Sequence, residues 1–170
     1  MPALKNVDHT APDDFTAEAI LRYYNPVILK DFQPKQVADD GNCMCRAVSL
    51  GMFGTEDFHI YLRLLTALEM AYNPEFYDSD HINFTDLIKD NRIVTSSFED
   101  LLNAALTVGA YSEMADIFAV SAALKFPMQS YFPPLSTAEK LSDAYRCFIY
   151  GRGVKKTLSP RCQLMWSCTA

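Results

Sequence analysis

One short stretch of the chain combines residue types that can carry out nucleophilic chemistry. Asp40, Gly41 and Asn42 form a turn sequence directly before Cys43, where a helical pattern begins. A thiol at a helix N-terminus lies at the positive end of the helix dipole, beside backbone N–H groups without helical partners. Both effects favour the thiolate, which is the nucleophilic form. The same N–H groups can stabilise the oxyanion of a tetrahedral intermediate, so the spacing predicts a catalytic cysteine.

Simpler interpretations of these residues stand beside the catalytic one. The alternative interpretation of Cys43 is a buried structural thiol, since cysteines outside disulfides are often buried. Asp-Gly is a common turn sequence, so Asp40 has a structural explanation as well. Cys43 and Cys45 form a Cys-x-Cys pair without a second Cys or His pair at zinc spacing, so no metal site is expected. Cys45 itself is expected to pack in the core.

A cysteine nucleophile needs a base, and the sequence contains three histidines. His59 falls on the polar face of a predicted helix and is expected to be solvated. His81 follows Asp-Ser-Asp and is expected to be a surface cap. His9 lies in a polar N-terminal segment beside Asp8, with further acidic residues close by. His9 is therefore the candidate substitute base, against the alternative of an ordinary solvated residue.

Composition and charge limit the class of protein. The 170 residues suit one domain with a core, and 49% hydrophobic with 21% charged residues is a globular composition. A net charge of −6 argues against nucleic acid as the main partner and suits a basic protein partner. No apolar run is long enough to span a bilayer, so no membrane role is expected. Five cysteines without Cys-x-x-Cys, and no apolar leader, predict a reduced intracellular protein, cytoplasmic or nuclear.

Periodicity and capping signals predict several helices followed by a small sheet. The expected helices cover residues 16–25, 43–53, 56–72, 97–108 and 112–125, and the expected strands 126–132, 145–150 and 163–166. This order indicates an α+β domain. Residues 1–15 are polar and are expected to form a flexible N-terminal arm, with the domain over residues 16–170.

Two of the predicted helices matter for the core. The helix over 112–125 has little polar surface and is expected to be buried. The helix over 56–72 is amphipathic, with an apolar stripe of Tyr61, Leu65, Leu68 and Tyr72. His59, Arg63 and Thr66 lie opposite this stripe. The simplest expectation is that the apolar stripe faces the core and the polar face meets water.

The turn and the helix after it resemble the ovarian-tumour (OTU) family of cysteine proteases. The resemblance rests on the Asp-Gly-Asn-Cys turn followed by Arg46, Ala47, Ser49 and Leu50. Residues 56–73, with Arg63 and Glu69, are similar to the family's long second helix. Residues 109–113 resemble the start of its buried helix, and residues 126–131 its first central strand. The similarity runs from about Phe32 to Tyr131 and more faintly to Trp166, and vertnin-type OTU-like domains are closest in character.

This resemblance implies a papain-like OTU fold, with a small central β-sheet packed between helices. It also implies a deubiquitinase, an isopeptidase that removes ubiquitin or a ubiquitin-like protein from lysine side chains without a cofactor. Cys43 would attack the ubiquitin C-terminal carbonyl carbon. Asp40, Gly41, the neighbouring Asn42 and the Cys43 amide would shape the oxyanion site.

The sequence departs from the family pattern at the general base, the residue that accepts the thiol proton. The family has a C-terminal histidine followed by an aromatic residue, whereas here the residues after Trp166 contain none. Three explanations stay open: the chain lacks its His-bearing strand, it is an inactive OTU-like module that binds ubiquitin or another protein, or His9 substitutes. Because a general base contributes about 10²–10⁴-fold in rate, these explanations differ strongly in activity. A coincidental turn in an unrelated α+β domain is the remaining alternative.

Overall fold

The computed structural model describes residues 10–86, 96–134, 139–159 and 162–166, and it has the expected α+β composition. The α-helices of these residues are α1 (Phe15–Tyr24), α2 (Cys43–Phe53), α3 (His59–Tyr72), α4 (Phe98–Leu106), α5 (Met114–Leu124) and α6 (Glu139–Tyr145). Single 3₁₀ turns follow α1, at Ile28–Lys30, and α3, at Pro74–Phe76. The strands are β1 (Met128–Tyr131), β2 (Phe148–Ile149) and β3 (Cys162–Met165). No helix in these ranges is long and apolar enough to cross a bilayer.

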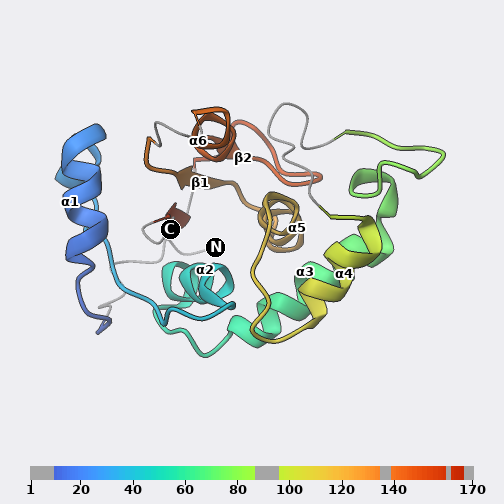
Figure 1. The fold of residues 1–170 in the computed structure, drawn as a ribbon, viewed down its shortest axis with the longest axis horizontal. Coiled ribbons are helices and arrows are strands. Elements are labelled where there is room, and N and C mark those ends of the chain that lie inside the picture. Colours follow the sequence, from blue (N-terminus) through green and yellow to red (C-terminus); the bar gives the residue numbers. More distant parts are fainter. Residues whose placement is uncertain (1–9, 87–95, 135–138, 160–161, 167–170) are drawn as a thin grey trace.

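The three strands form one mixed sheet in the order β2-β1-β3. β1 is antiparallel to β2, with Met128 opposite Ile149, and parallel to β3, with Met128 opposite Cys162. The sheet lies on one side of α5, and α3 with α4 lies on the other, while α1 stands at the edge of the molecule (Figure 1). The domain is therefore built around α5.

Helix α5 is buried along most of its length. Every residue from Met114 to Ala122 is buried, and the helix packs against α3, α4 and β2. Its residues are nearly all apolar, so contact on several sides removes apolar surface from water without stranding polar groups. The predicted burial of this helix is confirmed.

Helix α3 presents the opposite face to the one expected. Tyr61 and Tyr72 of the apolar stripe are 58% and 80% exposed, whereas Arg63 is only 3% exposed. The prediction that the polar face meets water was wrong, because α5, α4 and the loop before α2 all pack on that face and supply acceptors for Arg63. Leu65 alone among the four stripe residues packs against the core.

The helix ends follow local capping. α1 begins at Phe15, one residue earlier than the expected helix over 16–25, because the Asp14 side chain accepts a hydrogen bond from the Ala17 N–H at 2.8 Å. α4 begins as expected, with the Ser97 hydroxyl accepting from the Asp100 N–H. Its C-terminal end comes earlier than predicted, at Leu106. α6 was not predicted. β1 and β2 are shorter than the strands expected over 126–132 and 145–150, and β3 begins one residue earlier than expected.

The described end of the N-terminal arm is tied to the domain. Asp13 forms an antiparallel bridge with Lys35, and the Lys35 ammonium lies 2.7 Å from the Asp13 carboxylate. Pro12 and Asp14 make backbone hydrogen bonds to residues 36 and 34. The flexible arm expected over residues 1–15 therefore does not extend to residues 12–14. Residues 1–9, with His9, lie outside the described part of the chain.

We predict that Gly151→Ala strongly destabilises the fold. A Cβ at Gly151 would lie 2.2 Å from the Ala122 nitrogen and 2.5 Å from the Phe118 oxygen, both backbone atoms of α5. Neither can move without shifting α5 away from β2, so we expect a loss of at least about 3 kcal/mol in urea unfolding. The control is Gly153→Ala, where φ is +72° and no backbone atom lies within 4 Å. We expect it to cost about 1 kcal/mol, and equal losses would contradict the steric explanation.

Candidate active site

The segment Asp40–Cys43 forms a tight turn that ends at the first residue of α2. The Cys43 N–H donates to the Asp40 carbonyl at 2.9 Å, and the Asn42 N–H donates to the Asp40 carboxylate at 2.9 Å. Asn42 has φ −97° and ψ 2°, and the φ of Gly41 is not positive, which identifies a type I turn. The Cys43 side chain is partly exposed at the start of the helix. The predicted turn and helix start are confirmed.

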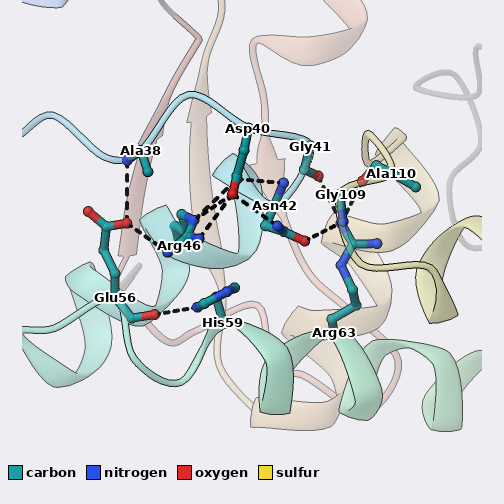
Figure 2. A network of polar contacts seen from close by, with 10 residues as sticks. All are labelled: Ala38, Asp40, Gly41, Asn42, Arg46, Glu56, His59, Arg63, Gly109 and Ala110. Carbon is teal, nitrogen blue, oxygen red and sulfur yellow. Dashed lines mark hydrogen bonds and ion pairs between the residues drawn. The ribbon is translucent and has the colours of Figure 1, made fainter.

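A network of ion pairs holds the first residue of this turn. The Arg46 guanidinium lies 3.0 Å from Asp40 and 3.2 Å from Glu56, so it bridges the two carboxylates (Figure 2). Hydrogen bonding from Arg46 holds the pKa of Asp40 well below its usual range. Glu56 also accepts from the Ala38 N–H. The chain before the turn is thus attached both to α2 and to the connection between α2 and α3.

The loop around Gly109 packs directly on the turn. The Asn42 amide nitrogen donates to Asp40 at 3.0 Å, and its oxygen accepts from the Gly109 N–H at 2.9 Å. A Cβ at Gly41 would lie 1.7 Å from the Gly109 carbonyl oxygen, so only glycine permits this approach. Gly109 itself has φ +87°, which favours glycine. The two glycines therefore serve one contact between segments nearly seventy residues apart.

A buried arginine lies beneath the turn. Arg63 on α3 donates to the Gly41 carbonyl at 2.8 Å and to the Ala104 carbonyl, at the end of α4, at 2.7 Å. It also donates to the Ala110 carbonyl (Figure 2). Periodicity placed Arg63 on the solvent side, so its contact with the turn was missed. The family resemblance, which singled out this arginine, was the one signal in the sequence that pointed to it.

The described cysteines differ sharply in accessibility. Cys45 is 1% exposed, and burial raises the pKa of its thiol to about 12. Burial likewise raises the pKa of Cys162 to about 12. Cys147 is partly exposed but precedes β2 and does not start a helix. Cys43 combines exposure with a helix N-terminus, and Cys45 packs in the core as expected.

The two described histidines have partners away from the cysteine. The His59 Nδ1 lies 2.8 Å from the Glu56 carbonyl oxygen, and the ring is half-buried, not solvated as expected. His81 accepts from the Asn83 N–H at 3.2 Å. The Cys43 amide, expected to serve the oxyanion, is engaged by the Asp40 carbonyl. In this conformation the turn therefore presents the thiol but does not direct that amide outward.

The C-terminal strand lies against the helix that begins at Cys43. α2 packs on β3, and a Cβ at Gly51 would lie only 2.9 Å from the Cys162 sulfur. Trp166, directly after β3, donates its indole N–H to the Ser130 hydroxyl at 2.9 Å. The fold thus brings the end of the sheet to the same part of the core as the cysteine helix.

Comparisons with known proteins agree with this architecture. The family model described as "Vertnin, OTU domain" matches residues 34–99, which include the turn, α2 and α3. Among solved structures, the OTU domain of OTUD1 matches with a TM-score of 0.56 at 19% identity, covering 89% of this chain and 85% of that chain. The chain contains an OTU-like domain. The expected α+β class and the OTU-like character expected from the turn and helix residues are confirmed.

A second solved structure is also similar to this OTU-like domain. The viral OTU domain protease from Dera Ghazi Khan virus matches with a TM-score of 0.46 at 16% identity, covering 78% of this chain and 74% of that chain. A comparison with curated proteins gave no match.

We predict that Asp40→Asn lowers stability at neutral pH by about 1 kcal/mol, since it removes a partly solvated ion pair with Arg46. Because the folded pKa of Asp40 is depressed, its contribution is complete above the unfolded pKa of about 3.9 and is lost as pH falls further. The stability difference between wild type and variant, measured by urea unfolding, should stay constant from pH 7 to 5. It should then shrink from pH 4 to 2.5. A difference that grows on acidification would contradict the assigned ion pair.

Proposed function

We propose that this OTU-like domain is a cysteine isopeptidase that releases ubiquitin or a ubiquitin-like protein from lysine side chains. The proposal is carried by one observation: Cys43 is a partly exposed thiol at the N-terminus of α2, directly after a turn braced by Asp40 and Asn42. Its neighbour Cys45 is buried, and burial raises the pKa of that thiol. Cys43 is therefore the nucleophile that the chemistry requires.

The proposed reaction is acyl transfer in two steps. The Cys43 sulfur attacks the carbonyl carbon of the isopeptide bond, and the C–N bond of the tetrahedral intermediate then breaks. The thiol proton passes through a base to the departing lysine amine. Water next adds to the thioester, which releases the ubiquitin carboxylate and restores the thiol. The helix N-terminus supports the first step by favouring the thiolate.

Three of the turn residues have proposed roles beside the nucleophile. Asp40 and Asn42 hold the turn in shape through their mutual hydrogen bonds, and Gly41 allows the Gly109 loop to approach. Oxyanion stabilisation by the Cys43 amide requires that its hydrogen bond to the Asp40 carbonyl be exchanged for one to the substrate. Substrate binding would then have to open the turn.

The base is the second proposed component. His9 is the candidate within this sequence, because His59 and His81 already pair with residues 56 and 83. Asp8 precedes it and is available to orient the imidazole. The family's own base follows a strand corresponding to β3, which packs here against α2. A histidine supplied after that strand would therefore also approach the cysteine helix.

A second candidate function is an OTU-like module that binds a ubiquitin-type or other protein partner without hydrolysis. It is favoured by the hydrogen bond from the Cys43 N–H to the Asp40 carbonyl at 2.9 Å, which occupies the expected oxyanion donor. Binding at the same surface would leave that bond in place. The two functions differ in whether Cys43 becomes acylated.

We predict that ubiquitin carrying a C-terminal electrophile forms a one-to-one covalent adduct with this protein through Cys43. Intact mass spectrometry should show the adduct in the wild type and its absence in Cys43→Ala. The matched control is Cys45→Ala, which removes a buried thiol two residues after Cys43 on the same helix and should retain the adduct. An adduct that persists in Cys43→Ala would overturn the assignment of the nucleophile.

We predict that His9→Ala lowers the rate of adduct formation at pH 7 by about 10²-fold if His9 is the base. His59→Ala is the matched control and should leave the rate within about twofold, because its ring is bonded to the Glu56 carbonyl. An unchanged rate in His9→Ala would exclude it as the base. Wild-type protein that binds ubiquitin in a pull-down but forms no adduct would favour the binding module.

A further inference from the structure

The Gly41–Asn42 peptide, the central peptide of the turn before Cys43, is held from both sides. Its carbonyl oxygen accepts from the Arg63 guanidinium at 2.8 Å. Its N–H donates to the Asp40 carboxylate at 2.9 Å. A cationic donor and an anionic acceptor thus fix the two ends of one peptide dipole. Hydrogen bonds to charged groups are about twice as strong as neutral ones, so the orientation of this peptide is strongly specified.

Without these contacts the peptide has an alternative orientation. A type I turn converts to type II when the central peptide rotates, which requires a positive φ at the third residue. That residue is Asn42, and asparagine tolerates the left-handed region better than most residues. Rotation would reverse the peptide dipole immediately before the Cys43 thiol.

Arg63 is unusually placed for a residue that merely packs. It is 3% exposed, and its hydrogen bonds all go to backbone carbonyl oxygens, from the end of α4, the Ala110 loop and the turn. Its Nε has no hydrogen-bond partner among the described residues. A buried guanidinium carries a large desolvation cost that an apolar side chain would avoid. Its donor fork does what an apolar side chain cannot, because it joins three segments at once.

We propose that Arg63 is a positioning residue for Cys43: by holding the Gly41 carbonyl, it keeps the Gly41–Asn42 peptide in the orientation that favours the thiolate. The proposal rests on the proposed function, because positioning matters for catalysis only where Cys43 is the nucleophile. Arg63 acts through the turn, at a distance from the bond that would be cleaved.

The test measures the rate at which iodoacetamide alkylates Cys43, resolved by peptide mass spectrometry, between pH 5.5 and 9.5. Arg63→Lys is the decisive variant, since it keeps a positive charge but loses the fork that reaches Gly41 and Ala104 together. We expect its alkylation profile to move to higher pH, with the rate at pH 7 falling about three- to tenfold, the size of a helix-terminus effect. Arg63→Met should shift the profile further, since it also removes the charge.

A matched control is available on the same helix. Arg152 donates to Glu69 on α3 at 2.7 and 2.9 Å, two turns along the helix from Arg63. Arg152→Met removes a guanidinium bound to α3 without touching the turn. It should lower thermal stability and leave the Cys43 profile within twofold. Cys147, in the same digest, reports any general loosening of the fold.

Each outcome decides the proposal. A shifted Cys43 profile in Arg63→Lys, with Cys147 and the Arg152 control unchanged, supports it. A wild-type profile in Arg63→Lys overturns it, even where Arg63→Met is shifted, because the arginine would then act by its charge alone. Should Arg63→Met fail to fold, Arg63→Lys still decides. Because alkylation needs no ubiquitin, a missing ubiquitin adduct in the wild type would count against the proposed function and leave this comparison intact.

Discussion

The guanidinium of Arg63 has no room to reach water, and its donors are aimed at backbone carbonyl oxygens from three separate segments. An ionised group in that position is tolerated only when most of its N–H groups are satisfied, and both terminal nitrogens of Arg63 donate to carbonyl oxygens. The end of α4, the loop that begins α5 and the turn before α2 must therefore all converge on one face of α3. The orientation of α3 follows from this requirement, and so does the exposure of its tyrosines.

The turn before Cys43 depends on this constraint on one side and on the Asp40–Arg46–Glu56 ion pairs on the other. The two systems meet at Asn42, whose side chain donates to Asp40 and accepts from Gly109. A nucleophile needs such rigidity, because small displacements of a reacting atom lower the rate steeply. The same rigidity also suits a surface that recognises a protein without chemistry. The geometry of the turn thus supports both candidate functions, and acylation of Cys43 separates them.

The core is completed by two elements that carry no candidate catalytic residue. α5 is apolar on almost all sides, and it separates the sheet from α3 and α4 (Figure 1). β3 pairs with β1 and packs on α2, so the last described strand supports the helix that begins at Cys43. Two segments separated by more than a hundred residues thereby become neighbours at the cysteine helix.

Local signals in the sequence were sufficient to predict much of this protein's secondary structure and its fold class. The Asp-Gly-Asn turn, the start of α2 at Cys43, the start of α4 near residue 97 and the burial of α5 were all predicted, because each depends on residues within one or two helical turns. The order of helices and strands indicated the α+β class for the same reason. The resemblance to OTU domains was likewise indicated by a short local pattern, the turn before Cys43 and the helix that follows it.

Tertiary structure decided what those signals could not. Periodicity shows that α3 has two faces, but only its neighbours determine which face is buried, and here carbonyl groups from distant segments made burial of Arg63 favourable. The contact of Gly109 with Gly41 and the hydrogen bond from the Gly109 N–H to the Asn42 side chain also depend on segments meeting in three dimensions. The sequence by itself determined the nucleophile candidate and the fold class, because both are local patterns. The packing around that cysteine was decided by the tertiary structure, because satisfying a buried charge is a property of the whole fold.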